Sequence, residues 1–340
     1  MTSNDAADRP VPLPVAGGTD WESPSTDPND ETFGDVVSGI DRDGGHDALD
    51  DYAAVLVGEP FDAAVIGRRG AAGGPDAIRD SLTGVKTHRF GRDPPMNGTI
   101  GDLGNVVADA GSEEDSDRDA LREAARSVAT RVHGAAVAPV FLGGDNSLTV
   151  PNVEPLLAAA GPDETVGVCN LDAHLDVREV RGSYTSGTPY RELLEAGLDV
   201  YVVAGARDFE TSTVYADFVD EHDGTVVTAD ELGRDPTDAR DRIREALAAV
   251  DHLYVSVDCD VLDAPAAPGV SAPTPGGLTS RELFGLVDDL VADPRLRGFE
   301  VVECAPPLDE DGRTVDVAAR TVARALSVIG GAGEVGGEDR

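Results

Sequence analysis

Four short segments of the chain combine acidic and polar side chains at spacings that could hold metal ions. They are Gly143–Ser147 (GGDNS), Asp172–Asp176 (DAHLD), Asp258–Asp260 (DCD) with Asp263 close behind, and Glu303. A run of apolar residues precedes each segment, which indicates that each lies at the end of a β-strand. Open parallel sheets bind ligands beyond the carboxyl ends of their strands. These four segments are therefore expected to meet in one crevice.

The spacing within two of these segments places several candidate ligands on one side of the chain. Residues i, i+2 and i+4 of an extended segment point the same way, so Asp172, His174 and Asp176 should face one point. Asp258 and Asp260 follow the same rule. Adjacent carboxylates repel one another unless cations or protons neutralise them, and carboxylates with imidazole suit Mn²⁺ or a similar ion. A single such aspartate is usually part of a surface turn, whereas two clusters after apolar strands predict a site for two divalent metal ions.

The three cysteines of the chain flank these segments but are not expected to bind metal. They are Cys169, Cys259 and Cys304. Cys259 alternates with the two aspartates beside it, so its side chain should point to the opposite side, into the core. Free cysteine usually packs as a small buried hydrophobe, and three cysteines do not make a disulfide framework.

The charge of the chain excludes several function classes. Its 340 residues carry 27 Lys+Arg against 65 Asp+Glu, a formal net charge of −38, and Lys86 is the only lysine. Such a field repels nucleic-acid backbones and anionic lipids, no apolar run is long enough for a transmembrane helix, and the first residues do not resemble a signal peptide. We therefore expect a cytoplasmic protein that binds neither nucleic acid nor membranes. The acid excess is typical of a halophilic surface in molar salt, with a partner-binding acidic surface as the alternative.

The remaining pattern predicts one α/β domain around a parallel sheet. From about residue 60, short β-branched runs alternate with longer helical patterns, which is typical of βαβ units. Strands are expected at 61–67, 139–142, 165–171, 199–204, 225–228, 253–257 and 299–302. Helices are expected at 74–82, 116–133, 151–160, 187–196, 236–250, 279–292 and 315–329. The domain should span 51–330, between an acidic extension at 1–50, disordered or wrapped on the surface, and a flexible tail at 331–340.

In this order, these motifs resemble the ureohydrolase family of arginases, agmatinases and formimidoylglutamases. The resemblance runs from about residue 60 to 329 and includes three further motifs, GGPDAIR (73–79), SGTP (186–189) and GGLT (276–279). It implies a three-layer α/β/α arginase-like fold with a central parallel sheet and two Mn²⁺ ions per subunit. It also implies a small-molecule amidine or guanidine substrate and a homo-oligomer.

The resemblance assigns roles to the residues of the four segments. The metal ligands that it implies are Asn146, Asp172, His174, Asp176, Asp258 and Asp260. Asp172 and Asp258 would bridge the two ions, and a water acidified by both ions would attack the amidine carbon. Asp176 would also be catalytic, because it would hold this nucleophile and pass its proton to the leaving amine. Glu303 would bind the cationic amidinium by charge-assisted hydrogen bonds.

Two residues depart from the arginase and agmatinase pattern. Asn146 stands where the family usually has a histidine ligand, and an amide oxygen is a poorer ligand for Mn²⁺, so one metal site is expected to be weaker. Ser186 stands where those enzymes carry a histidine that is a proposed proton shuttle. With the run NLDAHLDVR (170–178), both departures resemble the formimidoylglutamase branch. That enzyme hydrolyses N-formimidoyl-L-glutamate to L-glutamate and formamide in histidine degradation.

A substrate with two carboxylates calls for cations in its binding site. Arg178 directly follows the metal cluster, and Arg207 follows the strand expected at 199–204. Either arginine could clamp a carboxylate through two hydrogen bonds, with an ordinary surface position as the alternative for each. Ser186 and Thr279 complete the substrate-binding set that we expect.

Two other functions remain open from the sequence. An agmatinase or another guanidino-compound hydrolase would use the same metal centre. A non-catalytic member of the family, acting in assembly or regulation, is supported only by the missing histidine at Asn146. The retained aspartates, His174 and Glu303 argue against it. Metal content and an activity panel would separate these functions.

Overall fold

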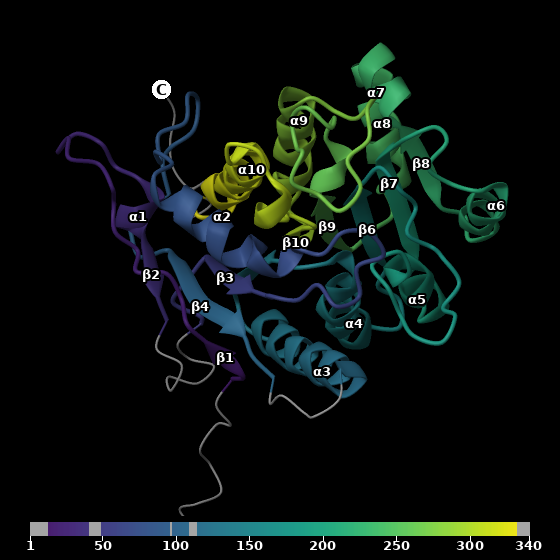
Figure 1. Cartoon of the computed structure of the whole chain (residues 1–340), viewed down its shortest axis with the longest axis horizontal. Coiled ribbons are helices and arrows are strands. Elements are labelled where there is room, and N and C mark those ends of the chain that lie inside the picture. The colour runs from purple at the N-terminus through teal and green to yellow at the C-terminus, as the bar shows by residue number, and fades with distance from the viewer. Residues whose placement is uncertain (1–12, 41–48, 96, 109–113, 332–340) are drawn as a thin grey trace, which may run out of the picture.

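A ten-stranded sheet forms the centre of the molecule. The computed structural model describes residues 13–40, 49–95, 97–108 and 114–331. The strand order is β1-β4-β3-β5-β10-β9-β6-β7-β8, and β2 also pairs with β4 (Figure 1). Every pairing is parallel except that of β1 with β4. The strands are β1 (Val15–Ala16), β2 (Val37–Gly39), β3 (Ala54–Gly58), β4 (Ile100–Val106), β5 (Ala138–Leu142), β6 (Val166–Leu171), β7 (Val200–Ala206), β8 (Thr225–Thr228), β9 (His252–Asp258) and β10 (Leu296–Val302).

Helices cover both faces of the sheet, as Figure 1 shows. They are α1 (Phe33–Val36), α2 (Gly74–Thr83), α3 (Glu114–His133), α4 (Thr149–Ala159), α5 (Pro189–Glu195), α6 (Thr213–Glu221), α7 (Ala229–Arg234), α8 (Pro236–Ala246), α9 (Ser280–Val291) and α10 (Arg313–Ile329). Helices α3 to α6 share one buried core with the sheet, and the other helices share a second core. Alternation along β3 feeds both cores, because Leu56 packs into one and Val57 into the other. The expected three-layer α/β/α fold is confirmed.

Most of the expected elements are present within a few residues of their predicted ends, but the strand expected at 61–67 is wrong. The segment is a loop, and the strand is the preceding apolar run, β3. Its backbone groups are bound outside the sheet: the N–H of Ala64 donates to Asp145 Oδ2 at 2.8 Å, and that of Ile66 donates to Ser186 Oγ at 3.2 Å. An apolar run has the same sequence pattern in a strand and in a buried loop. The long-range hydrogen bonds therefore decide which of the two conformations this segment adopts.

Strand β4 was not predicted, because two glycines, Asp102 and Asn105 interrupt its apolar pattern. The buried carboxylate of Asp102 forms an ion pair within the fold. The guanidinium of Arg79, in α2, is fully buried and donates two hydrogen bonds of 2.9 Å to Asp102. A charged pair of this kind is stable inside a protein only when both partners are hydrogen-bonded, as they are here.

The described part of the N-terminal segment is wrapped on the domain and joins the sheet. Val15 and Ala16 pair with β4, and the indole N–H of Trp21 donates to Asp102 at 3.0 Å. The other parts of the expected extension, 1–12 and 41–48, and residues 332–340 of the expected tail lie outside the described residues. Among the described helices, none has the length and apolar character that a membrane crossing requires.

Candidate active site

The strand order brings the four chemical segments together. Strands β5, β10, β9 and β6 are consecutive neighbours in the sheet, and each is followed by one of these segments. Because the four strands are parallel, their carboxyl ends lie along one edge. The single crevice expected from the sequence is therefore formed at the middle of the sheet, where flanking strands hold the segments in place.

Two overlapping groups of candidate metal ligands lie at this edge. Asp172, His174 and Asp260 form one group, and Asp172, Asp176 and Asp258 form the other, each with its ligand atoms within 4.8 Å of one another. In the first group, the Nδ1 atom of His174 lies 3.1 Å from Asp260 and 3.5 Å from Asp172. Asp172 belongs to both groups.

The convergence arises from turns and not from the extended alternation that the sequence suggested. Asp172 Oδ1 accepts a hydrogen bond from the backbone N–H of His174 at 2.7 Å, and Asp258 Oδ1 accepts one from that of Asp260 at 2.8 Å. In both segments the first aspartate therefore closes a tight turn onto the residue two places later. Asp176 continues the bend with a φ of 45°, in the left-handed region that Asp adopts more readily than most residues.

Burial makes this cluster of acids electrostatically unfavourable without a cation. Burial and the neighbouring aspartates raise the pKa of Asp176 and of Asp258 well above the usual value, and burial also raises that of Asp172. Burial alone would lower the pKa of His174, but the charges of Asp260 and Asp172 raise it to about 12. A divalent cation would favour the ionised carboxylates and the neutral imidazole, so this donor set fits a metal centre.

Glu303 lies beside the candidate metal ligands, and one of its carboxylate oxygens has no hydrogen-bond donor among the described residues. Its Oε1 atom accepts a hydrogen bond from the backbone N–H of Asn146 at 3.1 Å. Its Oε2 atom is buried and contacts no donor among the described residues. Burial, then the charge of Asp145, raises the pKa of Glu303 well above the usual value. A cationic N–H donor entering the site would satisfy this oxygen.

Asn146 is fully buried against the cluster. Its Nδ2 atom lies 2.7 Å from Asp176 Oδ2, and its Oδ1 atom lies 2.8 Å from the hydroxyl of Thr149. The side chain thus reaches the acidic group that the sequence assigned to the metal site.

Sequence reasoning missed Glu210, in the loop after β7. Its Oε2 atom lies 3.6 Å from Nε2 of His174, on the side of the imidazole opposite Asp260. This is an ion-pair distance, and a carboxylate beside the outer nitrogen of a metal-binding histidine favours the tautomer whose other nitrogen can bind the ion. No local motif marks Glu210, because only the path of the loop brings it to His174.

A cavity of about 130 Å³ opens onto the cluster. Its lining consists of Ile66, Gly67, His174, Asp176, Arg178, Ser186, Gly187, Asp258, Asp260, Ser271, Ala272 and Glu303. Arg178 and Ser186 therefore line the cavity, as expected for substrate-binding residues. The hydroxyl of Ser186 accepts the backbone hydrogen bond of Ile66, so it also holds the loop that replaced the expected strand.

Arg207 and Thr279 are not among the residues that line this cavity, and their expected role in substrate binding stays a prediction. The guanidinium of Arg207 is directed at backbone carbonyls, with contacts of 2.6 Å to Asp260 and 2.9 Å to Thr274. Its hydrogen bonds therefore stabilise the backbone around Asp260. Thr279 is exposed and caps α9, where its side chain accepts from the N–H of Glu282. The GGLT motif therefore starts a helix at this position.

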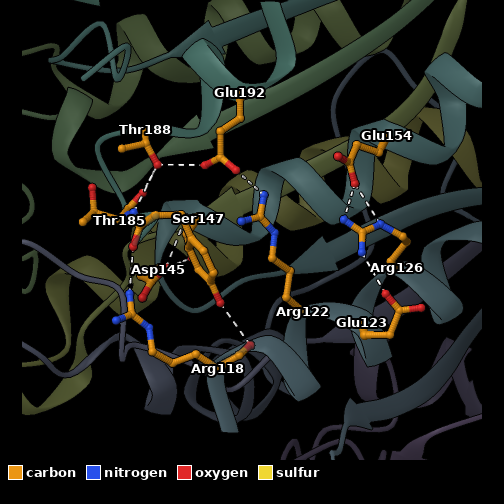
Figure 2. Close-up of polar contacts among 11 residues, drawn as sticks. Arg118, Arg122, Glu123, Arg126, Asp145, Ser147, Glu154, Thr185, Thr188 and Glu192 are labelled. Atoms are coloured by element: carbon orange, nitrogen blue, oxygen red, sulfur yellow. Dashed lines mark hydrogen bonds and ion pairs between the residues drawn. The ribbon is translucent and has the colours of Figure 1, made fainter. Parts of the chain in front are cut away.

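A set of polar contacts fixes the loop that carries Ser186. Arg122 of α3 forms an ion pair with Glu192 of α5 at 2.6 Å, and Glu192 accepts a hydrogen bond from the hydroxyl of Thr188 at 2.8 Å (Figure 2). Thr188 in turn accepts from the backbone N–H of Thr185 at 3.1 Å. The loop is thus connected to two helices of the layer on which it rests.

The three cysteines are buried in the core and are absent from both ligand groups of the described residues. Burial raises the pKa of Cys169 to about 12, which disfavours the thiolate that metal binding needs. The expectation that Cys259 points into the core is confirmed.

The chain is similar to known proteins in both sequence and structure. Residues 52–327 match the arginase family model. A formimidoylglutamase of Halobacterium salinarum is 56% identical over 91% of this chain and 97% of its own. The crystal structure of formimidoylglutamase from Bacillus subtilis has a TM-score of 0.81 at 26% identity, covering 91% of this chain and 94% of that chain. A Trypanosoma cruzi formiminoglutamase structure with Mn²⁺ has a TM-score of 0.73 at 26% identity, covering 82% and 94%. The chain therefore belongs to the arginase family.

Proposed function

We propose that this protein is a manganese-dependent formimidoylglutamase that hydrolyses N-formimidoyl-L-glutamate to L-glutamate and formamide. The observation that carries the proposal is an acidic metal cluster whose cavity is lined by Arg178. The side chain of Arg178 is exposed, and no described residue lies within hydrogen-bond or ion-pair distance of its guanidinium. A free arginine beside the cluster suits a substrate that ends in carboxylates and disfavours the cationic tail of agmatine. The Halobacterium relative, named a formimidoylglutamase, supports this choice of substrate.

The cluster would hold two Mn²⁺ ions. The shared position of Asp172 in both ligand groups supports a bridging role, and carboxylates with a single imidazole suit this ion. When bound, the ions supply a nucleophile at neutral pH by lowering the pKa of water. Asn146 would complete the site next to Asp176, with lower affinity than a histidine would give.

Three residues of the chain would guide the reaction. Glu303 would accept the amidinium N–H groups through its unpartnered Oε2 atom and so orient the amidine carbon toward the metal cluster. Asp176 would accept a proton from the attacking water and donate it to the glutamate nitrogen. The water oxygen would form a bond to the amidine carbon, and the bond from that carbon to the glutamate nitrogen would break. The glutamate nitrogen would keep the bonding electron pair and receive both protons of the water, one of them through Asp176, so that formamide and glutamate leave. Arg178 would hold a carboxylate of the substrate throughout.

An activity panel tests the proposal. The purified chain, loaded with Mn²⁺ in molar KCl, would be assayed on formimidoylglutamate, agmatine, arginine and guanidino acids. We expect formamide and glutamate from the first substrate and no urea from the others. Urea without formamide would assign the chain to another ureohydrolase activity. Absence of turnover on every substrate, with two Mn²⁺ bound, would support a non-catalytic member.

The physiological setting follows from composition and resemblance. A place in histidine degradation, a cytoplasmic location, a halophilic surface and a homo-oligomer stay predictions. They set the conditions of the assay, because a net charge of −38 calls for high salt.

A further inference from the structure

The hydroxyl of Thr149 lies between two acceptors, although it has one hydrogen to donate. Its Oγ1 atom is 2.8 Å from Oδ1 of Asn146 and 2.6 Å from Oε1 of Glu300. All three side chains are fully buried. A hydroxyl can donate to only one of these oxygens, and the other must then face the lone pairs of Thr149 without a hydrogen. Such an unmatched pair is costly inside a protein.

Glu300 is held rigidly as the preferred acceptor. Its Oε2 atom accepts from the phenol of Tyr254 at 2.7 Å and from Nδ2 of Asn152 at 3.1 Å. Burial raises the pKa of Glu300, and hydrogen bonds from Thr149, Tyr254 and Asn152 oppose this rise. A carboxylate is a stronger acceptor than an amide oxygen, and its contact with Thr149 is also the shorter one. The hydroxyl of Thr149 is therefore directed to Glu300.

This direction fixes the amide of Asn146. When Thr149 donates to Glu300, its lone pairs are free to accept, so the end of the amide that faces Thr149 must be the donor Nδ2. Exchanging the two ends of the amide leaves the positions of its atoms almost unchanged. The oxygen then faces Asp176, where the amide approaches the carboxylate to 2.7 Å. Two oxygens at this distance repel each other unless a cation binds both or a proton lies between them, and a metal ion in the cluster would be such a cation.

We propose that Thr149 and Glu300 are positioning residues that turn the amide oxygen of Asn146 toward the metal cluster. The inference rests on the metal centre of the proposed function and explains how an asparagine can serve there. A histidine presents a nitrogen to the metal whichever hydrogen bond holds it. An asparagine presents either an oxygen or an NH₂ group, and only the oxygen can bind a cation. The hydrogen bond from Thr149 to Glu300 determines which end of the Asn146 amide faces the cluster.

A double-mutant cycle on Mn²⁺ affinity tests the proposal. Thr149→Val removes the hydroxyl at nearly constant volume, and Thr149→Ser keeps it as the matched control. Both are made with Asn146 and with Asn146→Asp, whose carboxylate has oxygen at both ends and needs no orientation. Mn²⁺ binding is titrated by calorimetry and by electron paramagnetic resonance. Circular dichroism verifies the fold, and Thr149→Ala replaces the valine variant if that variant does not fold.

With Asn146 present, Thr149→Val should weaken the lower-affinity Mn²⁺ site by about tenfold, as loss of a hydrogen bond to a metal ligand typically does. Thr149→Ser should stay within about twofold of the wild type. In the Asn146→Asp background, Thr149→Val should have no effect on this affinity. Equal losses in both backgrounds, or no loss with Asn146, would overturn the proposal. Failure of the proposed function would instead appear in the wild type, as missing formamide or missing Mn²⁺.

Discussion

The Nδ1 atom of His174 lies 3.1 Å from Oδ2 of Asp260, and this contact joins the ends of β6 and β9. The opposite nitrogen, Nε2, lies 3.6 Å from Glu210. The imidazole therefore has one carboxylate near each of its two nitrogens. If Nε2 carries the hydrogen toward Glu210, Nδ1 is free to bind a cation beside Asp260. The loop after β7 thereby contributes to a site that is otherwise built on strand ends.

Replacing Glu210 should weaken metal binding without removing a ligand. We expect Glu210→Gln to raise the Mn²⁺ dissociation constant of the His174 site by about tenfold, because loss of the charged partner makes the imidazole a poorer ligand. Titration followed by electron paramagnetic resonance measures this change. Asp208→Asn, at an exposed position in the same loop, is the matched control and should bind Mn²⁺ normally. Identical affinities for both variants would show that Glu210 does not orient His174.

Asp176→Asn should abolish turnover while leaving the fold intact. Asparagine tolerates the left-handed φ of 45° at this position, so the backbone has no reason to change. An amide cannot accept and return the proton that the reaction requires, and kcat is expected to fall by about 10²- to 10⁴-fold. Formamide release gives the rate, and thermal unfolding verifies the fold. A fall in kcat of less than about tenfold would lie below this expected range and would exclude Asp176 as the proton carrier.

Arg178→Gln should impair substrate binding more than catalysis. Removing a charge-assisted hydrogen bond to a substrate carboxylate costs about 1.5–3 kcal/mol, which corresponds to a rise in KM of about 10- to 150-fold. Mn²⁺ affinity and kcat should change little, because among the described residues no hydrogen bond or ion pair joins the guanidinium of Arg178 to a candidate metal ligand or to Glu303. The control is Arg181→Gln, whose side chain is exposed and pairs with Glu179. A fall in kcat at constant KM would contradict the proposed role of Arg178.

The sequence was sufficient for the residues whose position depends on strand ends. Asp172, Asp258 and Glu303 each follow a buried parallel strand, and any order of neighbouring strands would place them at the same edge. The type of each side chain then indicated metal chemistry. Their detailed geometry was less accessible, because the turns after β6 and β9 depend on hydrogen bonds from side chain to backbone.

Residues whose role depends on loop paths could not be assigned from the sequence. Arg207 has the charge to bind a carboxylate, but three backbone carbonyls lie around its guanidinium and occupy it. Glu210, three positions later, has no distinguishing pattern and still reaches His174. Segment 61–67 has the composition of a strand, yet Asp145 and Ser186 bind its N–H groups. In each case the partner lies far along the chain, where local periodicity carries no information.

His133 should make the stability of the fold sensitive to mild acid. Burial lowers its pKa to about 4, and its Nε2 atom contacts the carbonyl oxygen of Asn152 at 2.9 Å. Because the folded pKa lies below the unfolded value of 6.5, its contribution is complete above pH 6.5 and is lost as the pH falls toward 4. We expect a loss of about 2 kcal/mol in the free energy of unfolding between pH 7 and 5.

Urea unfolding in molar KCl with a chelator measures this dependence without metal binding. His133→Gln should remove the part of the pH dependence that belongs to His133, so its free energy of unfolding should fall less than that of the wild type over the same interval. His88→Gln, at an exposed position, should behave like the wild type. Parallel curves for His133→Gln and the wild type would show that His133 titrates normally in the fold.

Low salt should destabilise the protein through repulsion between its acidic side chains, and helix α6 offers a local test. Asp217 and Glu221 are exposed, stand one helical turn apart, and lie toward the negative end of a helix without basic residues. The Debye length is about 3 Å in 1 M salt and about 30 Å in 0.01 M salt, so the repulsion between the two carboxylates grows on dilution. Asp217→Arg replaces it with an ion pair and should raise the midpoint of thermal unfolding in dilute buffer, with little effect in molar KCl. Asp217→Asn should give a smaller rise. A wild type that is equally stable in both buffers would contradict the halophilic interpretation of the −38 charge.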